Sequence, residues 1–400
     1  MDSESDESGS WTGYPCLHGN LKEKLNCEKC YLKESKSNRK HQKHVNMKAQ
    51  NEKLQDEQAR QHQPAIQRTF RRTQSFHILT GALAVVLPLS LIVWIVHYIL
   101  PFRSNESELS PLRCFMSIFI PSLVLYDATK NKKLDTFASI IAFVMGFVET
   151  LSNLCMMATT IAFFMVGSKA TKFRRRRKDF DEHESAQGGR RNWIQVISNG
   201  GVGMEISILL LIERGPANEM PINFPYDYFP TWLSIAFLGA MACACGDTLA
   251  SELAPTLTSA QPRLITNPLM KVPRGTNGGV TLLGFICSAL GGFVCGLTYY
   301  ISTMICVNPE LLLRSPPQWP LLLIGTIAGL LGSIIDSIMG ATVQFSGYDQ
   351  NTGKIVSRSS RDVIWISGSE ILDNHSVNMM STLITALITP YFGRLIWANI

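Results

Sequence analysis

The sequence has 400 residues, of which 46% are hydrophobic and only 17% are charged. Soluble globular proteins carry about 25% charged residues, so this composition indicates a membrane protein rather than a soluble one. The net charge of +6 is too small to argue for nucleic-acid binding. The ten cysteines lie mostly alone within apolar stretches, where they are typical of small buried side chains and indicate no disulfide framework.

Residues 1–75 are almost entirely polar, and this composition predicts a disordered or weakly helical cytoplasmic tail. The tail contains Cys16, His18, Cys27 and Cys30, whose side chains are the types that hold Zn²⁺ in a tetrahedral site. A Cys-x-His pair is not a common zinc-finger spacing, so a tail with free thiols is the alternative. No signal peptide precedes the first apolar run, and the endoplasmic reticulum or another endomembrane is the default localisation.

Residues 76–400 are expected to form a multi-pass membrane domain, an all-α polytopic bundle of about nine helices. About 20 apolar residues cross roughly 30 Å of hydrocarbon, and this length sets the expected spans. The segment 134–168 is interrupted around residues 149–153, so it is either a helical hairpin or one long bent element. The expected helices cover residues 78–101, 112–127, 134–168, 193–213, 230–246, 279–306, 319–342 and 377–396.

Basic residues predict the orientation, because Lys and Arg near membrane ends mark the cytoplasmic side. Residues 169–178 contain seven such cations, and Lys130, Lys132 and Lys133 flank the other end of the 134–168 segment. Both ends of that segment, and with them the N-terminus, are therefore expected in the cytoplasm. The loops 246–278 and 343–376, which carry most polar motifs of the second half, then face the same side.

The first motif, residues 246–252, contains Asp247 and Glu252 at the end of an expected helix. Ionisable groups in membrane segments are costly and usually functional. On a helix, Glu252 points about 140° away from Asp247, so both serve one ion only if the helix breaks between them. The alternative is a polar helix terminus that reaches the lipid headgroups.

The second motif, residues 271–279, combines Lys271 and Arg274 with a glycine-rich turn before a membrane helix. Glycines let the backbone approach an anion, and N–H groups at a helix start favour phosphate. The spacing is not that of a P-loop. The alternative is a plain turn with cations that extend to the membrane surface.

Two further motifs carry acidic side chains. Asp336 lies on a helix face with Gly332 and Gly340, where small residues favour close helix contact and leave the acid unexplained by packing. Asp373 and Asn374 lie at a helix start, where Asp and Asn are also ordinary N-caps. Asn199 and Glu205 form a fainter set in the 193–213 helix, with Glu205 expected to face the bundle interior.

Together these groups predict a site for a phosphorylated lipid and Mg²⁺ at one membrane face. Magnesium is commonly held by one or two carboxylates plus substrate phosphates, and phosphoryl transfer needs mainly positioning and charge neutralisation. The expected metal ligands are Asp247, Glu252 and Asp336, and the expected catalytic residues are Asp247, Asp336 and Lys271. The residues expected to bind the nucleotide or substrate are Arg274, Asn277, Gly278, Gly279, Asp373 and Asn374.

The same motifs resemble the transmembrane protein 19 family over roughly residues 80–396. The resemblance lies in residues 191–196, 199–200, 246–252, 262–266, 271–281, 332–337 and 371–374. That family includes the phytyl-phosphate kinase of the vitamin E pathway, and the Gly-Asp-x-x-Ala-Ser pattern is also similar to phytol and dolichol kinases. The long N-terminal tail departs from the family, which leaves its role in localisation and regulation open.

The resemblance implies a Mg²⁺-dependent isoprenyl-phosphate kinase that uses a nucleoside triphosphate, with CTP as the suggested donor. Animal-type members lack an obvious phytol pathway, so farnesyl or geranylgeranyl phosphate is the expected substrate. The alternative is a transporter or channel in which Asp336 and Glu205 line a pathway. A third interpretation is a non-catalytic scaffold, which predicts that substituting Asp247 or Asp336 by Ala leaves function intact.

Overall fold

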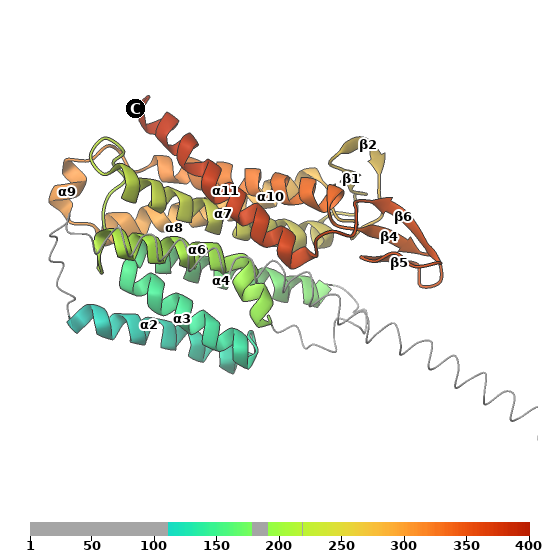
Figure 1. Ribbon diagram of the computed structural model, residues 1–400, viewed down its shortest axis with the longest axis horizontal. Coiled ribbons are helices and arrows are strands. Elements are labelled where there is room, and N and C mark those ends of the chain that lie inside the picture. Colours follow the sequence, from blue (N-terminus) through green and yellow to red (C-terminus); the bar gives the residue numbers. More distant parts are fainter. Residues whose placement is uncertain (1–110, 178–190, 218) are drawn as a thin grey trace, which may run out of the picture. The chain divides into compact units, whose positions relative to one another are not determined.

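The computed structural model describes residues 111–177, 191–217 and 219–400. The predicted Cys/His cluster in the tail and the expected helix 78–101 lie outside these residues. The described chain forms nine helices and two small antiparallel sheets (Figure 1). The helices are α2 (Pro111–Lys130), α3 (Thr136–Ser152), α4 (Leu154–Arg177), α6 (Trp193–Arg214), α7 (Tyr228–Leu257), α8 (Leu282–Cys306), α9 (Pro309–Leu313), α10 (Pro320–Thr342) and α11 (Asn374–Trp397).

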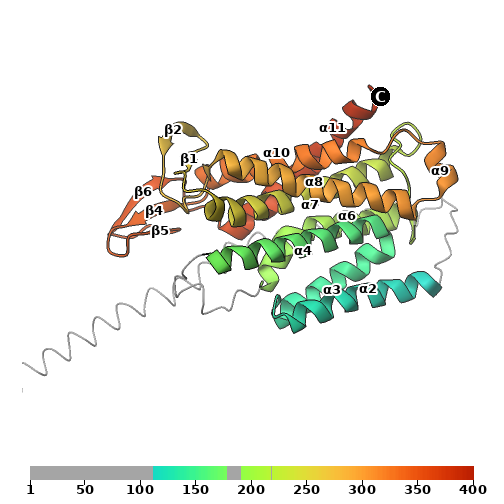
Figure 2. The same ribbon diagram turned by 180° about the vertical axis from the view of Figure 1, so that it is seen from behind.

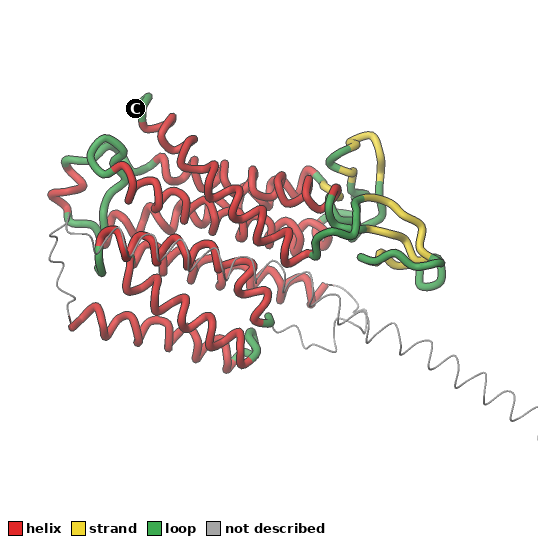
Figure 3. The backbone as a smooth tube through the Cα atoms, in the orientation of Figure 1, coloured by secondary structure: helices red, strands yellow, loops and turns green. Residues whose placement is uncertain are grey.

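Seven of the described helices are long and apolar enough to cross a membrane, and α3 is a shorter apolar helix of 17 residues. The predicted helix bundle is therefore confirmed, and the tube in Figure 3 shows how strongly helices dominate it. The 134–168 segment is a hairpin of α3 and α4. Asn153 separates the two helices with an extended backbone, and its side-chain oxygen accepts a hydrogen bond from the N–H of Cys155 at 2.8 Å.

Helix α7 forms the centre of the bundle. Of the residues in its most apolar window, 83% are buried, against 22–44% for the other six spanning helices, so α7 has almost no lipid-facing side. It contacts α4, α6, α8, α10 and α11. Six of the seven residues from Ala240 to Gly246 are Ala, Cys or Gly, and such small side chains permit tight helix packing in lipid.

Helices α8 and α10 meet almost backbone to backbone. A Cβ atom at Gly329 would lie 2.6 Å from Cα of Gly292, and one at Gly325 would lie 2.7 Å from Cα of Gly296. Real Cβ atoms do not come this close, so only glycine permits this contact. Gly325 and Gly329 of α10 thus pack against a glycine row on α8, whereas Gly332, on the predicted small-residue face, packs against Cys243 of α7.

The polar segments of the second half gather at one end of the helix bundle (Figures 1 and 2). The α2–α3 turn, with Lys130 and Lys133, lies at this same end, whereas α9 lies at the opposite end. The segments contain two three-stranded sheets, with strand orders β2-β1-β3 and β5-β4-β6. The strands are β1 (Arg263–Leu264), β2 (Asn267–Lys271), β3 (Gly279–Val280), β4 (Ser346–Asp349), β5 (Lys354–Val356) and β6 (Val363–Ser367).

One predicted boundary is wrong in a way that matters for the site. The sequence places a helix over 230–246 and a loop from 246, whereas α7 continues to Leu257. Asp247 and Glu252 therefore lie within a helix, and not in a loop after it. Hydropathy predicts the end of the helix at Gly246 because the residues that follow are polar. The backbone hydrogen bonds of α7 nevertheless continue past these residues.

Candidate acidic site at one end of the bundle

Asp247 and Asp336 come together because α7 and α10 pack side by side and run in the same direction (Figures 1 and 2). A Cβ atom at Gly332 of α10 would lie 2.9 Å from Cα of Cys243, which fixes the contact between the helices. Each acid follows its contact residue by four positions, which is about one helical turn. One turn further along, the two carboxylates are close enough for their charges to interact.

Both carboxylates are partly buried. The hydroxyl of Ser381 on α11 donates a hydrogen bond to Oδ2 of Asp336 at 3.0 Å. The thiol of Cys243 on α7 also contacts Ser381, with its sulfur 3.9 Å from the Ser381 oxygen. Three helices, α7, α10 and α11, thus contribute to one acidic site.

Two carboxylates of like charge repel each other unless a cation or a shared proton lies between them. The pair fits Mg²⁺, which is commonly held by one or two carboxylates while substrate phosphates and waters complete its octahedron. Within the described ranges 111–177, 191–217 and 219–400, no three His, Cys, Asp or Glu side chains form a metal-binding group. A Mg²⁺ ion at this pair would need further ligands from substrate phosphates and water.

Glu252, the third predicted metal ligand, faces α4 instead. Its carboxylate forms an ion pair with Arg174 at 3.4 Å, and the hydroxyl of Thr171 donates to it at 3.3 Å. The charge of Glu252 still acts on Asp247. Because α7 is helical at both positions, the two carboxylates point to different sides, and Glu252 has its own basic partner.

The glycine-rich turn packs onto α10 one turn beyond Asp336. Gly278 has a φ of +74°, and a Cβ atom there would lie 2.6 Å from the carbonyl oxygen of Ser337. Asn277 holds the turn to the second sheet, since its side-chain amide donates to the Phe345 carbonyl at 3.1 Å and its N–H donates to the Ser346 hydroxyl at 2.9 Å. Gly279 belongs to β3, so a short strand separates the turn from α8.

The two predicted phosphate-binding cations have different environments. The guanidinium of Arg274 donates to backbone carbonyls at the end of α7, at 3.3 Å to Pro255 and 2.5 Å to Thr258. Cationic side chains commonly satisfy the last carbonyls of a helix in this way. Lys271 is exposed on β2 beside Arg263 in the sheet register. Arg274 therefore has a structural partner, whereas Lys271 extends to solvent.

Asp373 and Asn374 lie at the start of α11, as predicted. Asp373 is the N-cap, and its carboxylate accepts the N–H of Ser376 at 2.8 Å. This is the ordinary role of an Asp at that position. Further along α11, the side chain of Asn378 donates to Asn199 of α6 at 3.2 Å, so the fainter polar set on α6 reaches the helix that also carries Ser381.

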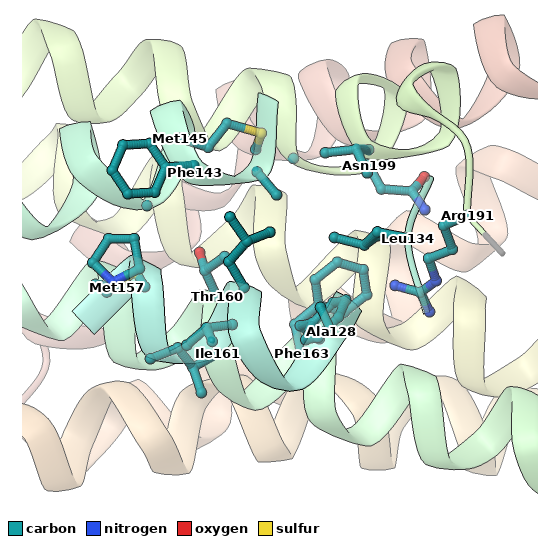
Figure 4. Close-up of a pocket in the computed structure, with 18 of the residues that line it drawn as sticks. Ala128, Leu134, Phe143, Met145, Met157, Thr160, Ile161, Phe163, Arg191 and Asn199 are labelled. Carbon is teal, nitrogen blue, oxygen red and sulfur yellow. The ribbon is translucent and has the colours of Figure 1, made fainter. Parts of the chain in front are cut away.

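An apolar cavity of about 90 Å³ opens between α2, α3, α4 and α6, with Met241 of α7 also at its wall (Figure 4). Its polar lining residues are Thr160, Arg191, Gln195 and Asn199. Figure 4 shows Arg191 and Asn199 on one side of the cavity and Met145 and Met157 on the other.

The sequence does not predict the roles of three polar residues near this site. Ser381 lies one turn after Asn378 on α11, and that spacing is the one signal that points to it. Arg174 belongs to a basic run from which the sequence predicts only the orientation in the membrane. Arg191 stands out only through the family resemblance, and its position against α4 and α7 depends on contacts between distant segments.

Comparison with known proteins supports the membrane assignment. The family model of the integral membrane protein DUF92 matches residues 119–386. Protein PGR of Arabidopsis thaliana is 35% identical over 286 residues, which cover 70% of this chain and 97% of that protein. An uncharacterized membrane protein of Methanocaldococcus jannaschii is 25% identical over 280 residues, covering 69% of this chain and 93% of that protein.

A third relative is the chloroplastic protein VTE6 of Arabidopsis thaliana, which is 23% identical over 183 residues, or 46% of this chain and 48% of that protein. No solved structure matches the chain. These matches confirm the resemblance drawn from the motifs. The chain belongs to the DUF92 family of integral membrane proteins.

Proposed function

We propose that this protein is a membrane-embedded, Mg²⁺-dependent kinase that phosphorylates an isoprenyl monophosphate. The observation that carries the proposal is the pair Asp247 and Asp336, held close together at one end of the bundle, with Ser381 donating a hydrogen bond to Asp336. The resemblance to a family that includes the phytyl-phosphate kinase supports the same chemistry. The substrate, the nucleotide and the metal are parts of the proposal.

In the proposed reaction, a terminal oxygen of the prenyl monophosphate forms a bond to the γ-phosphorus of a nucleoside triphosphate. The bond between that phosphorus and the β–γ bridging oxygen breaks, which yields a prenyl diphosphate and a nucleoside diphosphate. Asp247 and Asp336 would hold Mg²⁺, which supplies charge neutralisation for the phosphates when bound. Lys271 would attract the nucleotide, and Ser381 positions Asp336.

The depth of the acids favours an enzyme over a transporter. Asp336 is six residues before the end of α10, which is roughly 9 Å along the helix at 1.5 Å per residue. Transport sites usually lie near the middle of the bilayer. A site that acts on lipid headgroups and takes up a water-soluble nucleotide belongs near one surface, where the acidic pair and the glycine-rich turn meet.

A transporter or channel remains the second candidate, and Glu149 on α3 is the observation that favours it. This residue is fully buried, and within the described segments neither carboxyl oxygen has a hydrogen-bond partner. Buried acids in membrane helices often mark ion pathways. If the protein transports ions, Glu149→Gln abolishes flux in proteoliposomes, whereas a kinase retains its turnover with this variant.

The deciding experiment incubates the purified protein in detergent with γ-labelled CTP, ATP, GTP or UTP and with farnesyl, geranylgeranyl or phytyl phosphate. We expect labelled prenyl diphosphate from at least one combination, and loss of the product when EDTA removes Mg²⁺. No product from any combination, with protein that remains folded and monodisperse, would rule out the kinase. Product formation that survives EDTA would remove the metal from the proposal.

A further inference from the structure

The apolar cavity between α2, α3, α4 and α6 has the dimensions of part of a hydrocarbon chain. Its volume is about 90 Å³. A water-sized group takes about 10–15 Å³ on this scale, so the cavity holds about six to nine such groups, the size of one to two isoprene units. Its walls are mostly Leu, Val, Ile, Phe and Met side chains, which favour an apolar occupant over water.

A cation lies at the wall of this cavity. The guanidinium carbon of Arg191 is 5.8 Å from the ring centre of Phe163 and 5.9 Å from that of Phe164. The backbone around Arg191 is fixed, because its N–H donates to the Lys133 carbonyl at 2.9 Å and its carbonyl accepts from Asp135 at 3.1 Å. The charge is thus held at the cavity wall by rings and backbone together.

The same guanidinium reaches the acidic motif of α7. A Cβ atom at Gly167 would lie 2.8 Å from Nη2 of Arg191 and 3.4 Å from the methyl group of Thr248, so the missing side chain leaves room for the cation. Thr248 directly follows Asp247. Burial lowers the pKa of the Arg191 guanidinium, and the nearby charge of Glu252 opposes that shift. The Arg191 side of the cavity therefore adjoins the segment that carries Asp247.

A second polar connection runs along the other side. Asn199 lines the cavity and accepts a hydrogen bond from Asn378, and Ser381 lies one turn beyond Asn378 and holds Asp336. Asp336 is therefore linked to the polar lining of the cavity by hydrogen bonds that run through Ser381 and Asn378 to Asn199. An amphipathic molecule with its charged end at Arg191 would have its charge near Thr248 and Glu252, on the α4 side of α7, and its tail in the cavity.

We infer that this cavity holds the isoprenyl tail of a prenyl monophosphate, with the phosphate at Arg191. The inference rests on the proposed function and names the substrate-tail site that the kinase needs. Arginine suits the phosphate because its planar donors match phosphate oxygens. The cavity takes the isoprene units nearest the phosphate, and one chain fills it, so the occupant is a single-tailed prenyl phosphate rather than a two-tailed phospholipid.

The test measures binding without nucleotide, so that it does not depend on catalysis. Labelled geranylgeranyl monophosphate is titrated against wild-type protein, Ala142→Phe, Val144→Phe and Arg191→Gln. Ala142 lines the cavity, whereas Val144 on the same helix is 45% exposed on the outer side. We expect Ala142→Phe to raise the Kd at least tenfold and Val144→Phe to leave it within twofold.

Arg191→Gln should weaken binding of geranylgeranyl monophosphate at least tenfold. It should weaken binding of geranylgeraniol, which lacks the phosphate, far less. Unchanged binding by Ala142→Phe, or no binding by the wild type, would overturn the inference. Equal competition by dioleoyl phosphatidic acid would assign the cavity to phospholipid and overturn it too. If binding follows the expected pattern but no diphosphate forms with any nucleotide, the kinase fails and the tail site stands.

Photo-crosslinking of the wild-type protein tests the same inference without a variant, and it can therefore be used if Ala142→Phe does not fold. A geranylgeranyl phosphate with a diazirine on its second isoprene unit should label peptides that contain Met145, Met157 or Phe163. Labelling confined to the exposed face of α2, at Phe115 and Phe119, would place the tail in the surrounding lipid and contradict the inference.

Discussion

The two halves of the described bundle are packed in different ways. Helices α8, α10 and α11 all contact α7 closely, and the glycine rows of α8 and α10 meet almost backbone to backbone. Helices α2, α3, α4 and α6 enclose an apolar cavity. Packing without voids resists displacement, so the tight half suits carboxylates that need fixed positions. The looser half suits a flexible hydrocarbon tail, whose position needs less precision.

The largest expected effect comes from removing one charge of the acidic pair in the tight half. Asp247→Asn and Asp336→Asn keep the size of the side chain but weaken metal binding, so we expect each to lower kcat at least 100-fold. The measurement is transfer of labelled phosphate to geranylgeranyl phosphate by purified protein. Asp362→Asn, on an exposed loop at the same end, is the matched control. Equal activity in all three variants would favour the scaffold interpretation.

The difference in packing predicts opposite effects of the same substitution in the two halves. Gly329→Ala places a methyl group 2.6 Å from Cα of Gly292, and such overpacking typically costs about 1–3 kcal/mol. Gly201→Ala on α6 meets nothing closer than 3.4 Å and gains up to about 1 kcal/mol of helix propensity. In thermal unfolding experiments in detergent, Gly329→Ala should have a lower melting midpoint than the wild type, and Gly201→Ala should not. A similar loss in both would contradict the comparison.

Substitutions of the two cations near the glycine-rich turn should have different effects, one on nucleotide binding and the other on stability. Lys271→Gln removes an exposed charge, so we expect about a tenfold rise in the KM for the nucleotide, or about 1.4 kcal/mol, with no change in the melting midpoint. Arg274→Gln removes hydrogen bonds to the end of α7, so its melting midpoint should fall. Steady-state kinetics and thermal unfolding of both variants check this. The reverse pattern would exchange their roles.

Glu252→Gln should have the smallest effect. Its ion pair with Arg174 is partly exposed, and such pairs contribute about 0.2–1 kcal/mol. We expect a few-fold change in activity at most, and a double-mutant cycle with Arg174→Met should return a coupling energy of that size. A loss as large as that of Asp247→Asn would instead make Glu252 a metal ligand, as the sequence predicts.

Much of this architecture is predictable because each membrane helix is a long apolar run. Hydropathy therefore finds α2 to α11 apart from the short α9, and it marks the break at Asn153. The continuation of α7 past Gly246 is missed because the helix turns polar where it leaves its apolar surroundings. The short strands after Leu257 and Val343 are missed because two to five polar residues carry no periodicity.

The acidic site is only partly predictable from the sequence. Asp247 and Asp336 stand out as charges in apolar segments, so their importance can be inferred locally. Their meeting, the support from Ser381 and the pairing of Glu252 with Arg174 depend on which helices become neighbours. The cavity is invisible in the sequence, since its lining comes from five helices and each contributes ordinary core residues.

The central position of α7 has a consequence for how the protein is made. Because translation proceeds from the N-terminus, α7 is synthesised before α8, α10 and α11, and Asp247 therefore enters the membrane before Asp336 and Ser381 exist. An acid costs less near the end of a membrane helix than at its centre, and Asp247 lies ten residues from the end of α7. The nascent chain can thus keep this carboxylate hydrated until the last helices arrive and enclose it.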